Sequence, residues 1–158
     1  MKKFILLLIM MVSFGSSVYA EIFTETYTDS FEGKSKKFIE SRSGNINLDS
    51  CDFINIILQK NTTSGKMTIA FVNINEAWLN AKELKIKIDG KVSKVPGARN
   101  GDVGMGLPAI IFDPSPLKQQ ILKAKNVSFR IVIAGYPHKA DFDIPSSMLS
   151  EWKQIIKK

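Results

Sequence analysis

Cysteine and histidine are almost absent from this sequence, which contains one residue of each. With Cys51 as the single thiol, no intramolecular disulfide can form. With His138 as the single imidazole, zinc sites built from several His or Cys ligands are excluded. A lone cysteine beside an apolar run is most often a small buried hydrophobe, although Cys51 could instead react or pair with a second chain. We therefore expect neither a metal nor a cofactor.

The sequence also lacks an apolar run long enough to span a bilayer. Its longest run, Phe4–Val12, has nine residues, whereas a membrane-spanning helix needs about 20. The run follows Lys2 and Lys3 and precedes Val18-Tyr19-Ala20, the small-x-small pattern that a signal peptidase cleaves. Residues 1–20 are therefore predicted to be a signal peptide, and the alternative is an anchor kept in the mature protein. The short, Lys-led leader is typical of bacteria, so we expect a periplasmic or secreted protein without a stable membrane anchor.

A strong charge imbalance is missing as well. Cleavage after Ala20 would leave residues 21–158, a chain of 138 residues that matches a single globular domain. Losing Lys2 and Lys3 leaves 20 of the 22 basic residues against 15 acidic ones, a net charge of +5. The basic residues are scattered, without the clustered patch and interleaved aromatics that nucleic-acid binding needs. We expect no nucleic-acid partner and only a weak preference for acidic surfaces.

The clearest pattern present is the alternation of apolar and polar residues, which predicts half-buried strands. Leu84–Ile88 alternates in this way and is followed by Asp89-Gly90, a dipeptide that suits a tight hairpin turn, with a return strand over Val92–Val95. Val127–Ile133 and Ala140–Ile144 alternate too, on either side of a segment rich in turn residues. The second half of the chain is therefore predicted to contain two hairpins.

The first half gives a similar prediction. Phe53–Leu58 is apolar on both faces except at one position and suits a central strand. Asn61–Gly65 is a polar turn that leads into a strand beginning at Met67–Phe71. Ile22–Thr28 is a plausible edge strand, with a partner around Lys37–Ser41.

Two segments have the spacing of helices. Pro116 at the first position and Ser115 as a cap predict a helix over residues 116–125. After Ser146 and Ser147, either of which can cap, residues 147–157 carry an apolar stripe made of Met148, Leu149, Trp152, Ile155 and Ile156. Asn75–Lys82 is consistent with either a helical turn or a loop. The predicted fold is α+β: an antiparallel β-sheet or sandwich of about seven strands with two packed helices, the last at the C-terminus.

The segment Pro96–Pro108 holds four of the ten glycines. It ends in no Gly-Lys-Ser/Thr and has no GxGxxG order, so it is not a nucleotide-binding loop. It is either a mobile, exposed surface connection or a recognition loop, because long irregular loops are often functional. Arg99, Asn100, Asp102 and Met105 are the candidate residues for binding a ligand or partner.

Acid–base chemistry has one candidate cluster, consisting of His138, Asp141 and Asp143. The two carboxylates would lie on one face of a strand, about 6.6 Å apart, and with the imidazole they could bind a metal or share a proton. The same spacing is typical of a solvated strand face, and nothing around Cys51 resembles a nucleophile motif. We therefore expect a small exported binding or interaction protein without catalytic residues. Its partner would be an envelope or host protein, or a small ligand at the glycine-rich segment. The alternative is a small hydrolase or metal-dependent enzyme that uses His138, Asp141 and Asp143.

The order of elements after Ile88-Asp89-Gly90, with a helix, a hairpin and a final helix, resembles that of small exported proteins of the invasion-associated-locus-B type. The chain lacks the cysteines and the closing Gly-Phe motif of that family. The resemblance therefore assigns no role to any residue.

Overall fold

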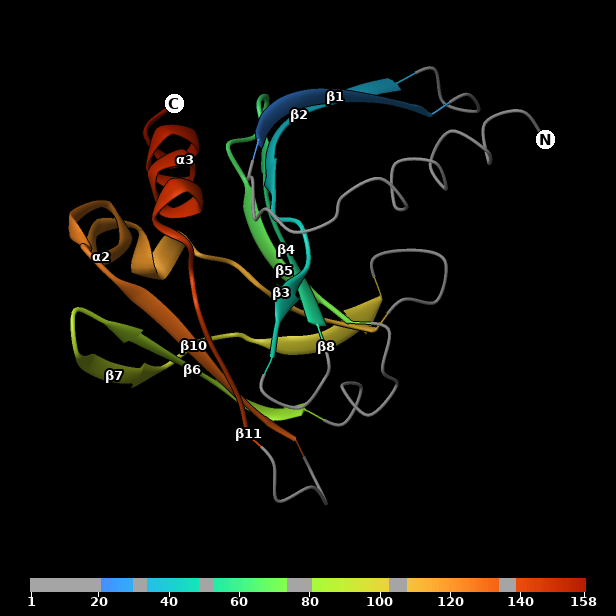
Figure 1. Ribbon diagram of the computed structural model, residues 1–158. Coiled ribbons are helices and arrows are strands. Elements are labelled where there is room, and N and C mark those ends of the chain that lie inside the picture. The colour runs from blue at the N-terminus through green and yellow to red at the C-terminus, as the bar shows by residue number, and fades with distance from the viewer. Residues whose placement is uncertain (1–20, 30–33, 49–52, 74–80, 103–107, 134–138) are drawn as a thin grey trace.

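The computed structural model describes residues 21–29, 34–48, 53–73, 81–102, 108–133 and 139–158. These residues form a mostly antiparallel β structure, with one seven-stranded sheet, one four-stranded sheet and two α-helices (Figure 1). The predicted combination of antiparallel sheets with two helices, the second at the C-terminus, is confirmed. The signal peptide assigned to residues 1–20, Cys51 and most of the ambiguous segment 75–82 lie outside the described residues.

The seven-stranded sheet has the order β1-β2-β4-β5-β9-β8, with the short β3 paired to β4. Its strands are β1 (Glu21–Asp29), β2 (Lys34–Arg42), β3 (Ile46–Asn47), β4 (Phe53–Asn61), β5 (Met67–Val72), β8 (Arg99–Asp102) and β9 (Pro108–Phe112). The four-stranded sheet has the order β11-β10-β6-β7. Its strands are β6 (Ala81–Ile88), β7 (Lys91–Lys94), β10 (Val127–Ile133) and β11 (Lys139–Asp143). The predicted central strand, edge strand and both hairpins are thus confirmed.

The core lies between the two sheets and is built on aromatic rings. Phe71 of β5 lies with its ring centroid 4.7 Å from that of Phe129 on β10 and 5.1 Å from that of Phe142 on β11. Phe112 of β9 joins them at 5.7 Å from Phe71. Edge-to-face contacts of this kind add to the free energy gained by burying the rings. The apolar residues of the predicted alternating strands therefore face one shared core between the two sheets.

Helix α3 (Ser146–Lys157) covers this core beside the shorter α2 (Lys118–Lys123), which continues a 3-10 turn over Ser115–Leu117 (Figure 1). The apolar stripe of α3 is at most 3% exposed, as predicted; it consists of Met148, Leu149, Trp152, Ile155 and Ile156. Three polar contacts hold the helix in place. Ser41 Oγ donates to Glu151 Oε2 at 2.7 Å, Lys60 Nζ donates to the carbonyl oxygen of Ile155 at 3.5 Å, and Lys153 Nζ donates to that of Ala124 at 2.6 Å.

The predicted helix caps are wrong. Pro145 is the N-cap of α3, without a capping side chain, and Ser146 is already the first helical residue. Ser115 lies inside the 3-10 turn, and its own N–H donates to Asp113 Oδ1 at 2.9 Å. A serine near a helix start is favoured only when its hydroxyl can accept from the first turn. Here proline geometry and Asp113 start the two helices instead.

The β6–β7 turn is confirmed at Asp89 and Gly90, which both have positive φ, 47° and 88°. Asp89 also fastens this turn to the segment before β10. Its Oδ1 accepts hydrogen bonds from the backbone N–H groups of Lys125 and Asn126, at 2.9 and 2.8 Å. The bond from Asn126, followed by the bond from Lys125, lowers the pKa of the Asp89 carboxyl below its ordinary value of 3.8. These bonds favour the ionised form.

We expect Asp89→Asn to remove one component of the acid sensitivity of the fold. A lowered pKa in the folded state contributes stability above the unfolded pKa, and that stability is lost as the pH falls through the folded value. Asparagine tolerates positive φ and keeps one acceptor oxygen. The wild type should therefore melt at a higher temperature than D89N at pH 6, and the two should converge toward pH 2. Asp143→Asn, an exposed carboxylate on β11, controls for the loss of charge. A difference in melting temperature between D89N and the wild type that stays constant with pH would contradict this role.

Candidate ligand-binding groove

The predicted recognition segment is not one continuous loop, because Arg99–Asp102 forms β8 and pairs with β9. The expectation of a mobile, irregular connection over Pro96–Pro108 is therefore wrong for these residues. Gly101 lies beside Ile111, where a Cβ at this position would come within 2.8 Å of the Ile111 Cδ1 atom. At least this glycine is thus explained by close packing in a sheet. Residues 103–107, which include Met105, lie outside the described residues.

Arg99 and Asn100 line only a very small cavity. Arg99 is exposed, and Asn100 Nδ2 donates to the carbonyl oxygen of Ala81 at 3.1 Å, which connects β8 to the start of β6. The cavity beside them has a volume of about 20 Å³. Such a space holds about one water molecule. Asp102 ends β8. The structure therefore places Arg99 and Asn100 together on β8, beside a cavity of that size among the described residues.

The candidate acid–base cluster is exposed where it is described. Asp141 and Asp143 both lie on the solvent side of β11, and His138 is outside the described residues. Both carboxylate oxygens of Asp141 accept hydrogen bonds from Arg130 on β10, at 2.6 and 2.5 Å. Asp141 in turn raises the pKa of Arg130. Within the described residues, no three or more His, Cys, Asp or Glu side chains come together to hold a metal ion.

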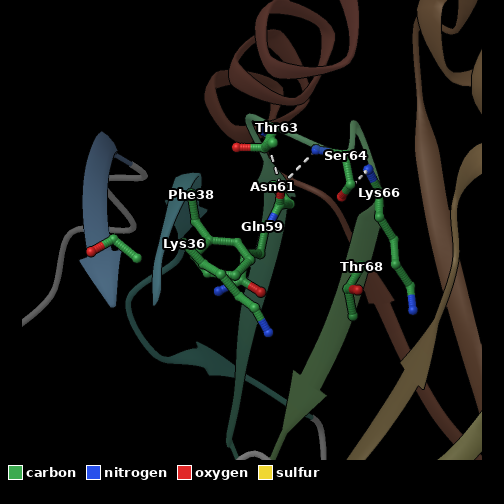
Figure 2. Close-up of a pocket in the computed structure, with 9 residues that line it drawn as sticks. Lys36, Phe38, Gln59, Asn61, Thr63, Ser64, Lys66 and Thr68 are labelled. Carbon is green, nitrogen blue, oxygen red and sulfur yellow. Dashed lines mark hydrogen bonds between the residues drawn. The ribbon is translucent and has the colours of Figure 1, made fainter. Parts of the chain in front are cut away.

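A groove with a volume of about 510 Å³ lies on the seven-stranded sheet, at the ends of β2, β4 and β5 near the β4–β5 turn (Figure 2). It lies outside the segment that the sequence suggested for recognition. Its lining residues are Ser35, Lys36, Phe38, Gln59, Asn61, Thr63, Ser64, Lys66 and Thr68. Volumes of about 300–1,000 Å³ are typical of small-molecule sites.

Strand register explains why these side chains meet. Gln59 is paired with Glu40 on β2 and with Thr68 on β5, and Asn61 is paired with Phe38. Residues that are directly paired across a sheet point to the same face. The neighbouring residues Ser41 and Lys60 bond to α3 on the opposite face. The groove therefore lies on the face of the seven-stranded sheet away from α3.

Asn61 fixes one end of the groove. Its Oδ1 accepts the backbone N–H groups of Thr63 and Ser64, at 2.9 and 2.8 Å, as the dashed lines in Figure 2 show. Gly65 closes the turn with φ of +70° and an N–H that donates to the Asn61 carbonyl oxygen. Because Oδ1 is already engaged by the turn, the side-chain amide of Asn61 presents its NH₂ group as a donor.

Gln59 is oriented by a buried carboxylate. Its Nε2 donates to Glu40 Oε1 at 2.5 Å, while the other Glu40 oxygen accepts from Arg42 Nε and Nη2 at 2.9 and 2.6 Å. The side chain of Glu40 is only 1% exposed, so these donors compensate for its loss of water. A carboxylate can only accept hydrogen bonds, so the Gln59 amide must turn its NH₂ toward Glu40. Its carbonyl oxygen is left as an acceptor.

The groove carries positive charge. Lys36 and Lys66 are exposed, and neither forms an ion pair with another described residue. Figure 2 shows their side chains on either side of β4. None of the nine lining residues is acidic. The lysines therefore make the groove suited to an anion.

No protein family, curated protein or solved structure matches this chain. The chemistry of the groove must therefore be inferred from its own residues. It combines two cations, several hydroxyl and amide groups and one aromatic ring, and its lining has no Cys, His, Asp or Glu. Such a set can bind and orient an anionic ligand through charge and hydrogen bonds. No helix in the described part of the chain has the length and apolar character to cross a membrane.

Proposed function

We propose that this chain is a small exported binding module, without catalytic activity, that takes an anionic ligand in the groove between β2, β4 and β5. The observation that carries the proposal is the pair of lysines, Lys36 and Lys66, in a concave lining without any acidic residue. Anions bind where fixed cations and hydrogen-bond donors converge. The NH₂ group of Asn61 and the hydroxyl groups of the turn supply such donors.

The contacts of the Ser35 hydroxyl group and of the Asp141 carboxylate favour a binding role over catalysis. Ser35 Oγ lies 3.0 Å from Thr28 Oγ1 in an exposed contact between two hydroxyl groups, neither of which is a base that could activate the other. The enzyme alternative needs Asp141 as an acid, a base or a metal ligand, but both of its oxygens are held by Arg130. Recognition of an envelope or host protein through Met105 rests on residues outside the described part of the chain, and no observation favours it.

Export is part of this proposal and rests on the leader in residues 1–20. Cleavage after Ala20 would remove no residue of a described strand, because β1 begins at Glu21. The groove would then be assembled outside the cytoplasm, in the periplasm or after secretion. The mass of the protein recovered from the producing cell tests this step, and a mass that includes Met1 would refute it.

We expect the double variant Lys36→Gln/Lys66→Gln to weaken anion binding at least tenfold, which corresponds to about 1.4 kcal/mol. The probes are tripolyphosphate, a tetraglutamate peptide and tetragalacturonate, each titrated into the isotope-labelled chain from residue 21 at 0.15 M salt. At least one probe should shift the backbone amide signals of Asn61, Thr63 and Lys66 in a saturable manner. Both lysines are exposed, so the folding stability should change by less than about 0.5 kcal/mol.

The matched control is Lys87→Gln/Lys91→Gln, which removes the same charge from exposed positions on β6 and β7 of the other sheet. It should bind each probe within twofold of the wild type. Equal losses in both double variants would mean that the probes respond only to net charge, and the groove would not be the site. No saturable shift with any probe would also refute the proposal.

A further inference from the structure

The uncharged polar groups of the groove point to the kind of anion that fits it. Besides its two lysines the lining offers four hydroxyl groups and two amides, from Ser35, Thr63, Ser64, Thr68, Gln59 and Asn61. We propose that the ligand is an acidic carbohydrate, a hydroxyl-rich oligosaccharide that carries carboxylate or sulfate groups. This inference rests on the proposed function and adds the class of ligand.

The two amides are held in opposite senses. Glu40 takes the NH₂ of Gln59 and leaves its carbonyl oxygen as an acceptor, whereas the turn takes the carbonyl oxygen of Asn61 and leaves its NH₂ as a donor. The residues are two apart on β4, which places their Cα atoms about 6.6 Å from each other on the same face. A sugar hydroxyl both donates and accepts, so successive hydroxyls of one ring can use both groups. A simple phosphate ion, which chiefly accepts, has no use for the Gln59 carbonyl.

An acidic peptide fits the same surface less well. Extended peptides commonly bind by pairing their main chain with a free strand edge. The three strands have a partner on each side over most of their length, because β2 lies between β1 and β4, β4 between β2 and β5, and β5 between β4 and β9. The edge left without a strand partner at the groove is short: residues 34–36 of β2, before its ladder with β4, and residues 67–68 of β5, before its ladder with β9. Phe38 is the one apolar residue among the lining residues, so the groove has no series of apolar pockets for the side chains of an extended peptide. A peptide would thus be held by its charges and by separate hydrogen bonds to the lining, without a long main-chain ladder or apolar anchors.

The size of the groove also separates a carbohydrate from a small inorganic ion. A volume of about 510 Å³ is within the range that small-molecule sites have and is far larger than one phosphate group needs. The lysines flank β4, one on β2 and the other immediately before β5 (Figure 2). Two strand spacings of about 4.8 Å each separate their backbones. An oligosaccharide with an acidic group on more than one ring can reach both.

The test compares dissociation constants by calorimetry at 0.15 M salt for four probes and four proteins. The probes are tetragalacturonate, a chondroitin sulfate tetrasaccharide, the neutral methyl ester of tetragalacturonate, and tetraglutamate. The proteins are the chain from residue 21, K36Q/K66Q, the control K87Q/K91Q, and Asn61→Asp. Asn61→Asp keeps an acceptor for the Thr63 and Ser64 N–H groups but replaces the donor NH₂ with a carboxylate oxygen.

We expect the better of the two acidic oligosaccharides to bind at least tenfold more tightly than the neutral ester and than tetraglutamate. K36Q/K66Q and N61D should each weaken the binding of that oligosaccharide at least tenfold, and K87Q/K91Q should leave it unchanged. If tetraglutamate binds as well as either acidic sugar, and K36Q/K66Q abolishes that binding, the carbohydrate inference is wrong while the proposed function stands. If none of the four probes binds while tripolyphosphate does, the carbohydrate inference is wrong and the proposed function stands. If tripolyphosphate also fails to bind, or the control loses as much as K36Q/K66Q, the proposed function itself is wrong. Folding of N61D is checked by its melting temperature, and an unfolded N61D is replaced by Thr68→Val, with the same tenfold expectation.

Discussion

Replacing Trp152 with alanine is expected to lower the free energy of unfolding by about 3–5 kcal/mol. Trp152 is fully buried on α3, and its ring lies 6.5 Å from that of Phe129 in an edge-to-face contact. Truncation removes this contact and leaves a cavity between the helix and the sheets. Urea unfolding followed by circular dichroism measures the change. Gln154→Ala, at an exposed position of the same helix, should stay within about 0.5 kcal/mol of the wild type.

Trp152→Phe separates the packing of the ring from the polar atom that it carries. Among the described residues, the indole Nε1 is the buried side-chain nitrogen or oxygen that has no hydrogen-bond partner. A buried polar group of this kind costs about 1–3 kcal/mol, and phenylalanine removes that cost while keeping most of the apolar area. W152F should therefore lose less than half of what W152A loses. Equal losses would mean that the indole N–H does have a partner.

Arg42→Met is expected to cost about 3 kcal/mol, because it leaves the carboxylate of Glu40 buried with one donor instead of three. The value lies at the low end for a broken buried pair, since the Arg42 side chain is itself 39% exposed. Arg42 also bonds to Glu25 at 3.1 Å and lies with its guanidinium carbon 4.7 Å from the centre of the Phe23 ring. Its loss should thus loosen β1 from β2 as well. Methionine preserves the length of the apolar stem.

The double variant Glu40→Met/Arg42→Met tests the cause of this loss. Removing the orphaned carboxylate should recover at least half of the stability lost in R42M, because the remaining apolar pair leaves no uncompensated buried charge. Lys37→Met, an exposed cation on the same strand, should change stability by less than about 0.5 kcal/mol. If R42M is as stable as K37M, water reaches Glu40 and the network contributes little.

Elements whose burial alternates along the sequence could be predicted well. In Ala81–Ile88 and Val127–Val132 each apolar residue is buried or half-buried, and the charged residues alternate with them, so the local pattern is enough to predict these strands. The helix α3 was equally predictable, since five apolar positions at helical spacing leave one face for the core. In both cases the local pattern and the tertiary packing agree.

The pair formed by β8 and β9 could not be predicted in this way. Pro108–Phe112 is a proline followed by four apolar residues, a pattern without any period. Arg99–Asp102 has almost no β propensity, and its ladder with β9 makes it a strand. The assignment of a loop failed for Arg99–Asp102 because strand formation there depends on a partner, which local residues do not encode.

The groove escaped sequence reasoning for a related reason. Its residues come from two stretches, 35–38 and 59–68, in which polar residues are typical of strand ends and turns. Only the register between β2 and β4 brings Phe38 beside Asn61 and Glu40 beside Gln59. One signal was available. Phe38 and Glu40 are two residues apart and so share one face of the strand, and an aromatic residue on that face is unusual for a purely solvated strand.

The side chains on one face of β2 and β4 contact α3, and those on the other face lie on the groove side. Binding of a ligand in the groove would therefore depend on the folded chain. Ser41 of β2 and Lys60 of β4 bond to α3. Their neighbours Glu40 and Gln59 bond to each other on the opposite face, where the groove lies. A ligand that recognises the assembled groove has nothing to bind in the unfolded chain. By mass action, such a ligand at 100 times its dissociation constant adds about 2.7 kcal/mol to the free energy of unfolding. The melting temperature of the chain should therefore rise with the concentration of any ligand that binds the groove, and the size of the rise ranks such ligands by affinity.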